Sequence, residues 1–136
     1  MTLGGDTGFL IGVIEQQKVA LEYWQQVLDE QSVLFISTIS INELLTYYYK
    51  RGKGDAAKKL IEEIQLLGSA IFVPVDKEIA ERSAGYRYGL GIPTVDSIVL
   101  ATFVQHLCDV ILTTDSHFEG VAKQDIIKVN MIRQSR

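Results

Sequence analysis

Hydrophobic and polar positions along the chain follow two alternating patterns. Short and almost continuous apolar runs are typical of strands that are buried on both faces. Longer segments with apolar residues three or four positions apart have the spacing of helices. The expected strands span residues 3–6, 32–36, 70–75, 110–113 and 126–129. The expected helices span residues 6–14, 18–30, 38–49, 55–67, 76–88 and 94–104.

Strands that alternate with helices favour a parallel sheet covered by helices on both faces. We therefore predict an α/β fold, a three-layer α/β/α sandwich with a short, mainly parallel central sheet. No internal repeat, linker or low-complexity tract divides the chain, so residues 1–136 are expected to form a single domain. A basic tail that ends in Arg133 and Arg136 is expected to be frayed.

The segment after Pro93 is apolar almost all round, which is typical of a helix in the middle of a domain. Pro93 is a helix-start signal, and Thr94 is the expected N-cap. The first turn nevertheless contains Asp96, and aspartate is rarely buried without a partner. One interpretation is that Asp96 only complements the positive end of the helix dipole.

Composition narrows the class of protein. The chain has 136 residues, 47% of them hydrophobic, and a formal net charge of -4, which argues against disorder and against coating nucleic acid by bulk charge. No apolar stretch approaches the ~20 residues of a membrane span, so we expect a cytoplasmic protein with no membrane contact. Cys108 is the only cysteine, which excludes an internal disulfide and a cysteine-based zinc site.

Four acidic residues lie where strands are expected to end or helices to begin: Asp6, Glu43, Asp96 and Asp115. Each has a structural explanation by itself; Ser40-x-x-Glu43, for example, matches a capping box. Because the carboxyl ends of parallel strands meet at one edge, the four could share a site. Clustered carboxylates need a counter-charge, and hard oxygen ligands suit Mg²⁺ or Mn²⁺. Two such ions ~3.5–4 Å apart can promote phosphoryl chemistry.

Residues 6–11 (DTGFLI), 41–44 (INEL), 93–101 (PTVDSIVLA) and 112–118 (LTTDSHF) together resemble the motifs of the PIN domain family. The similarity is greatest to the small prokaryotic members, which include the VapC-type toxins. The resemblance implies the same sandwich fold and Mg²⁺- or Mn²⁺-dependent cleavage of RNA. It also implies catalytic and metal-binding roles for four acids, and supporting hydroxyl groups on two threonines: Asp6, Glu43, Asp96 and Asp115, with Thr7 and Thr113.

Two histidines and a basic segment lie outside the four acidic motifs or beside them. The position of His117 is often acidic in relatives of the PIN family; we interpret it as a surface turn residue, with a catalytic histidine as the alternative. His106 is expected to be hydrogen-bonded structure. Residues 50–59 have a net charge of +4 and form either a solvated turn or a phosphate-binding rim. The candidates for binding an RNA strand are Lys50, Arg51, Lys53, Arg82 and Arg87.

The leading hypothesis is a divalent-metal-dependent endoribonuclease, and the toxin of a toxin–antitoxin pair is its more specific form. The resemblance implies an antitoxin protein whose tail covers the acidic pocket, and a homodimer formed through apolar helix faces. The alternative is a non-catalytic RNA-binding or protein-interaction module that keeps its acids for stability. A receiver-type phosphoacceptor domain is a weaker alternative, because it needs an acidic pair after the first strand and Asp6 stands alone.

Overall fold

The computed structural model describes residues 1–132, so Arg133 and Arg136 of the expected basic tail lie outside the described residues. The described strands are β1 (Thr2–Gly5), β2 (Val33–Ser37), β3 (Ala70–Val73), β4 (Val110–Thr113) and β5 (Lys128–Met131). The described helices are α1 (Thr7–Ile14), α2 (Lys18–Leu28), α3 (Ile39–Tyr49), α4 (Gly54–Leu66), α5 (Lys77–Leu90), α6 (Thr94–Gln105) and α7 (His117–Lys123).

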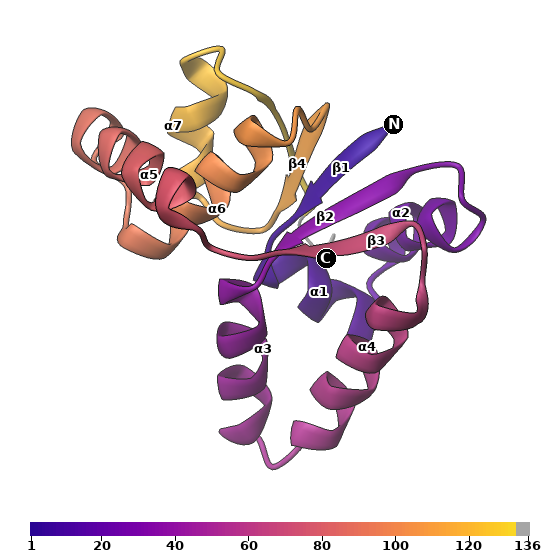
Figure 1. Ribbon diagram of the computed structural model, residues 1–136. Coiled ribbons are helices and arrows are strands. Elements are labelled where there is room, and N and C mark those ends of the chain that lie inside the picture. The colour runs from indigo at the N-terminus through magenta and orange to yellow at the C-terminus, as the bar shows by residue number, and fades with distance from the viewer. Residues whose placement is uncertain (133–136) are drawn as a thin grey trace.

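The strands form one sheet in the order β3-β2-β1-β4-β5, and every neighbouring pair is parallel. Helices α1 to α4 cover one face of this sheet, and α5, α6 and α7 cover the other (Figure 1). The predicted α/β/α sandwich is therefore confirmed. Strand β1 lies at the centre of the sheet. Asp6, which follows β1 directly, therefore lies in the middle of the edge formed by the carboxyl ends of the strands.

The two glycines of β1 look unfavourable for a strand in the sequence, but the packing explains Gly4. A Cβ atom at Gly4 would lie 2.5 Å from Cγ of Phe103. The Phe103 ring, which extends from α6, therefore packs directly on the backbone of β1. The neighbouring apolar residues of β4 divide between the layers, because Leu112 packs with α1 to α4 and Ile111 packs with α6 and α7. Because α6 packs closely on β1, the position of the N-terminus of α6 relative to the edge of the sheet is fixed.

Several local predictions were wrong, each for a physical reason. The N-cap of α6 is Pro93 rather than Thr94. The capping box Ser40-x-x-Glu43 does not form, because Ser40 lies inside α3 and its buried hydroxyl has no hydrogen-bond partner. The strand expected over residues 70–75, with an interruption at Pro74, agrees with the structure up to Val73 and does not continue beyond the proline. Helix α7 was not predicted, since residues 114–118 were interpreted only as a turn.

Other boundaries agree closely with the sequence. Asp76 caps α5 through a hydrogen bond from the backbone N–H of Ile79 to its Oδ1, and Gly91 ends that helix in the left-handed conformation that favours glycine. In residues 1–132, every helix is too short or too polar to span a bilayer. The expected cytoplasmic location stays a prediction.

Candidate metal centre

Asp6 lies directly after β1 and caps α1, where it is almost completely enclosed. Its Oδ1 accepts a hydrogen bond from the backbone N–H of Phe9 at 2.9 Å, and its Oδ2 accepts one from the hydroxyl of Thr113. Only 7% of the residue is exposed. Burial raises the pKa of Asp6 from its ordinary value of 3.8 to about 7, against the two hydrogen bonds, and the charges of Asp115 and Asp96 raise it further. A lone carboxylate in this position is therefore unstable without a counter-charge.

Glu43 extends from the second turn of α3 toward the same edge of the sheet. The Thr7 hydroxyl, in the first turn of α1, donates a hydrogen bond to Glu43 Oε1 at 2.7 Å. This contact joins two elements that are separated by 36 positions. In a capping box the Glu43 carboxylate would bond to the helix backbone, but here it bonds to Thr7. Its negative charge raises the pKa of Asp96.

Asp96 and Asp115 form the more exposed part of the cluster. Their side chains are 17% and 33% exposed. Burial, followed by the charge of Asp115 and a hydrogen bond with it, raises the pKa of Asp96 from 3.8 to about 6. The four acids identified from the sequence thus act on one another electrostatically, although they come from four separate segments of the chain.

His117 is not the free surface turn residue that we expected. Its Nδ1 lies 2.9 Å from Oδ2 of Asp96 and 2.8 Å from Oδ1 of Asp115, at the start of α7. One donor atom from each of these three residues lies within 4.8 Å of the others. The only signal in the sequence was the spacing Asp115-x-His117, which is too common in turns to be informative. His106, in contrast, stacks on Phe35 with ring centroids 4.9 Å apart, a structural contact.

A chain of hydrogen bonds connects the buried and exposed acids. The Thr113 hydroxyl donates to Asp6 and accepts from the backbone N–H of Asp115 at 2.9 Å. The turn also lies very close to α1, because a Cβ atom at Gly8 would be 2.1 Å from Oγ1 of Thr114. Glycine at this position lets the first turn of α1 approach the turn after β4, which brings Asp6 and Asp115 to the same place.

The residues present fit a divalent cation. No Lys or Arg nitrogen within residues 1–132 forms an ion pair with any of the four carboxylates; the only positively chargeable group in contact is the imidazole of His117. Carboxylate oxygens are the donors that Mg²⁺ and Mn²⁺ prefer. Asp6, which is buried, and Glu43, which is half-buried, lie outside the group of donor atoms within 4.8 Å. A cation here would offset both the burial and the repulsion that raise the pKa values of Asp6 and Asp96.

Basic residues line a cavity that reaches the acidic cluster from the α3 side. This cavity of about 460 Å³ lies along α3 and is lined by Glu43, Lys50 and Arg51 among others. Arg51 is held in place, because its guanidinium donates to the Tyr47 carbonyl at 2.9 Å and lies 3.5 Å from the centroid of the Tyr47 ring. Lys53 is exposed and does not line the cavity.

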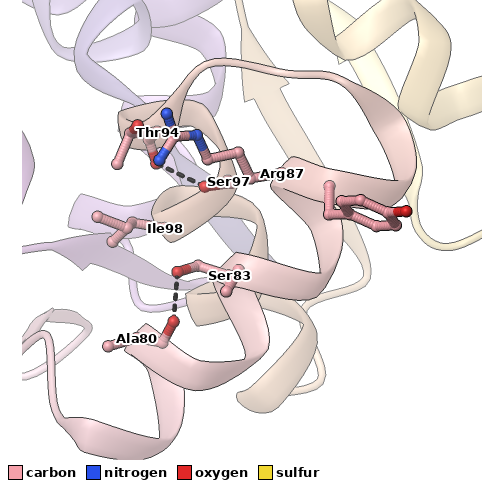
Figure 2. Close-up of a pocket in the computed structure, with 8 residues that line it drawn as sticks. Ala80, Ser83, Arg87, Thr94, Ser97 and Ile98 are labelled. Carbon is pink, nitrogen blue, oxygen red and sulfur yellow. Dashed lines mark hydrogen bonds between the residues drawn. The ribbon is translucent and has the colours of Figure 1, made fainter.

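A second cavity, of about 740 Å³, lies between α5 and α6 (Figure 2). Arg87 extends from α5 over the first turn of α6, beside Thr94 and Ser97, which flank Asp96 in the sequence (Figure 2). The Ser97 hydroxyl is occupied by a hydrogen bond to the Thr94 carbonyl at 2.6 Å. Arg82 does not line this cavity and lies 3.7 Å from Glu78.

Each of the two cavities contains a residue of the acidic cluster or a near neighbour of one, together with cationic side chains. The cavity along α3 is lined by Glu43, and the cavity between α5 and α6 is lined by Thr94 and Ser97, which lie close to Asp96 in the sequence. Helix α3 and the pair α5 and α6 belong to opposite layers of the sandwich (Figure 1). A polyanionic ligand is repelled by the acids themselves, and a bound cation reverses that repulsion.

Comparison with known proteins gives one family. The sequence model described as PIN domain matches residues 6–124. No curated protein sequence gives a significant match.

Solved structures with the same fold include several toxin–antitoxin proteins. A toxin–antitoxin complex from Klebsiella pneumoniae has a TM-score of 0.69 and 21% identity, and the match covers 98% of this chain and 99% of that one. VapBC2 from Rickettsia felis, bound to a promoter DNA fragment, has a TM-score of 0.74 and 12% identity. The match covers 96% of this chain and 98% of that one. VapC20 of Mycobacterium tuberculosis, described as a sarcin–ricin loop cleaving toxin, has a TM-score of 0.71 and 16% identity. That match covers 88% of this chain and 94% of VapC20. At these identities the likeness shows the fold.

Proposed function

Because this chain belongs to the PIN domain family, we propose that it is a divalent-metal-dependent endoribonuclease. Its substrate is an RNA phosphodiester bond, and its cofactor is Mg²⁺ or Mn²⁺. The catalytic and metal-binding groups in this proposal are four carboxylates that pair with no lysine or arginine of residues 1–132: Asp6, Glu43, Asp96 and Asp115.

One observation carries the proposal. Burial raises the pKa of Asp6 to about 7 and that of Asp96 to about 6, and the charges of acids from other segments of the chain raise both values further. A purely structural set of acids would reduce this repulsion by pairing with lysine or arginine. The energetic cost of the cluster is explained if a divalent cation neutralises it in the working protein.

The side chains of the chain divide the work between holding and orienting. Asp6, Glu43 and Asp96 would hold the cation, with Asp115 completing the set. The bound cation supplies Lewis-acid polarisation of a phosphoryl oxygen and lowers the pKa of water. Thr113 and Thr7 fix the carboxylates of Asp6 and Glu43 by hydrogen bonds, so that these oxygens keep their positions when substrate arrives.

The basic residues would bind the RNA strand on both sides of the cluster. Lys50 and Arg51 line the cavity that reaches Glu43, and Arg87 lines the cavity beside the first turn of α6. An RNA strand bound at both cavities would have its phosphates near the basic residues on the two sides of the cluster. Lys53 and Arg82 line neither cavity, so we assign them at most a long-range electrostatic contribution.

The deciding experiment is cleavage of structured and unstructured RNAs by the purified protein, with and without Mn²⁺. Wild-type protein is expected to cut only with the metal, and Asp96→Asn to lose at least about 10³-fold in rate while keeping its circular dichroism spectrum. Asp29→Asn is the matched control, because it removes the same charge from the exposed C-cap of α2. Mn²⁺ binding without cleavage of any RNA would support the non-catalytic alternative instead.

The toxin of a toxin–antitoxin pair is the more specific form of the proposal. It is supported by the fold shared with toxin–antitoxin proteins from several bacteria. In this form the protein acts in the cytoplasm as a homodimer and is inhibited by an antitoxin that covers the acidic pocket. Expression should arrest growth, and co-expression of the neighbouring gene product should relieve the arrest. Harmless expression of active enzyme would reject the toxin form and leave the nuclease proposal intact.

A further inference from the structure

We infer that His117 supplies a nitrogen ligand, through Nδ1, to the divalent cation of the proposed nuclease centre. This inference rests on the proposed function, since it concerns the same site. It changes the expected donor set from carboxylates alone to carboxylates with one imidazole.

The distances around Nδ1 are those of neighbouring ligands on one cation. Nδ1 lies 2.9 Å from Oδ2 of Asp96 and 2.8 Å from Oδ1 of Asp115. Two adjacent ligands of an octahedral cation, each ~2.1 Å from it, lie about 3.0 Å apart. Nδ1 therefore already lies about as far from each carboxylate oxygen as shared coordination requires, and one donor atom from each of the three residues lies within 4.8 Å of the others.

The backbone positions the imidazole in this arrangement. His117 is the first residue of α7, and its N–H donates to Oδ1 of Asp115 at 2.9 Å. The N–H of Asp115 in turn donates to the hydroxyl of Thr113, which also holds Asp6. These contacts connect the backbone at the start of α7 to the most buried acid of the cluster. They hold the segment from which the ring of His117 reaches the carboxylates of Asp96 and Asp115.

The atom that faces the two carboxylates is also the atom that can bind a metal. An imidazole nitrogen is a metal donor, and Nδ1 is the ring atom in contact with both carboxylate oxygens. The side chain of His117 is 53% exposed, so the ring leaves the site open toward solvent and substrate.

A nitrogen donor changes which metals the site prefers. Mg²⁺ favours oxygen ligands strongly, whereas imidazole suits transition-metal ions. We therefore expect Mn²⁺ to bind more tightly than Mg²⁺, by a margin that depends on His117. In the aspartate-rich form of the site that His117→Asp would create, that margin should shrink.

Pulsed electron paramagnetic resonance of bound Mn²⁺ tests the ligand directly. One equivalent of Mn²⁺ is added to metal-free protein, and ¹⁴N modulation from a coordinated imidazole is measured. The wild-type protein should show this modulation and His117→Ala should lose it. His106→Gln is the matched control, because His106 is the only other histidine of the chain and packs on Phe35 instead; it should keep the modulation.

The outcomes separate this inference from the proposed function. Bound Mn²⁺ with no ¹⁴N modulation in the wild type, or modulation that survives in His117→Ala, would overturn the histidine ligand while leaving the metal centre in place. Failure of the wild type to bind Mn²⁺ at all would overturn both. If His117 had only a structural role, His117→Ala would change the thermal stability of the protein and leave the spectrum of bound Mn²⁺ unchanged.

A second measurement uses affinities. The ratio of Mg²⁺ to Mn²⁺ dissociation constants, from calorimetric titration, should fall on the order of tenfold in His117→Asp relative to wild type. An unchanged ratio in that variant would contradict the inference even if its spectrum were difficult to interpret. Since α7 begins at an exposed position, both substitutions are expected to leave the fold intact.

Discussion

The acidic cluster has two parts that are built differently. The inner part consists of Asp6 and Thr113, at the ends of the central strands β1 and β4. The outer part consists of Asp96, Asp115 and His117, on the first turn of α6 and the turn into α7. Both oxygens of Asp6 accept hydrogen bonds from the protein and only 7% of the residue is exposed. The outer side chains are 17%, 33% and 53% exposed and contact one another.

This difference separates two requirements of a metal site. The inner part is rigid because strand ends, a helix cap and a buried hydroxyl all determine the position of one carboxylate. The outer part keeps its donor atoms accessible and lets them exchange partners, from a proton to a cation. Rigid ligands set the location of the site, whereas accessible ones allow metal and substrate to enter. The following predictions test this division, from the largest expected effect to the smallest.

Asp6→Asn should have the largest effect on activity and little effect on folding. Removing the innermost carboxylate is expected to reduce RNA cleavage by about 10³-fold or more. The metal-free variant should be at least as stable as wild type, since a buried amide avoids the desolvation of a buried charge. Cleavage rates and thermal unfolding without metal check both statements.

Asp115→Asn is a change in the outer part, and a smaller loss of about 10- to 100-fold is expected because Asp115 only completes the ligand set that Asp6, Glu43 and Asp96 provide. Equal losses in Asp6→Asn and Asp115→Asn would contradict the division into two parts.

Thr113→Val should uncouple the two parts. The variant loses the hydroxyl that donates to Asp6 and accepts from Asp115, so we expect about a 10- to 100-fold loss of cleavage. Because Oδ2 of Asp6 and the N–H of Asp115 lose their partner, the free energy of unfolding should fall by about 1–3 kcal/mol. Thr102→Val is the control, because its hydroxyl is equally buried but donates only to the Ile98 carbonyl of its own helix. Normal cleavage in Thr113→Val would show that the parts act independently.

Gly8→Ala should separate the two parts by a small displacement. The added Cβ would lie 2.1 Å from Oγ1 of Thr114, so α1 or the turn after β4 must shift. A loss of about tenfold in cleavage is expected from the misplaced ligands. Gly85→Ala in α5 is the control, since a Cβ there meets nothing within 4 Å and should stabilise the helix by about 0.5–1 kcal/mol. Unchanged cleavage in Gly8→Ala would mean that the site tolerates this displacement.

The pH dependence of stability should differ between metal-free and metal-loaded protein. The pKa values of Asp6 and Asp96 are raised from 3.8 to about 7 and about 6, so the folded state binds protons that the unfolded chain has released. The stability of metal-free protein should be highest below pH ~4 and should fall as the pH rises to about 7. We expect a decrease in melting temperature on the order of 5 °C between pH 5 and pH 8. Saturating Mn²⁺ should abolish this decrease, and Asp6→Asn should reduce it; a flat metal-free profile would contradict the assigned burial effect.

Lys50→Ala should have the smallest effect, because it lies outside both parts of the cluster. Loss of one phosphate contact from the cavity along α3 is expected to raise KM for RNA about threefold at moderate salt, with kcat unchanged. Lys53→Ala removes the same charge from a position outside the cavity and should change KM less. Identical effects of the two substitutions would show that net charge matters here rather than the cavity.

Local sequence patterns predicted much of this protein. Continuous apolar runs indicated buried parallel strands, and helix caps such as Asp76 are chosen by contacts within a few residues, so both can be recognised along the chain. Acids at strand ends could be identified for the same reason, because parallel topology brings those ends to one edge. The interpretation of Ser40 and Glu43 as a capping box failed, since a tertiary hydrogen bond from Thr7 draws Glu43 outward.

Tertiary structure alone decided how the cluster is assembled. The contact of His117 with Asp96 joins the start of α7 to the start of α6, and the Thr113–Asp6 hydrogen bond spans 107 positions. Neither residue type nor local spacing encodes such contacts; they depend on how closely α6 packs over Gly4 and α1 over Thr114. The sequence by itself therefore determined which groups could form a site, because chemistry and periodicity are local. Only packing determined which of them touch, because distances between distant segments follow from the whole fold.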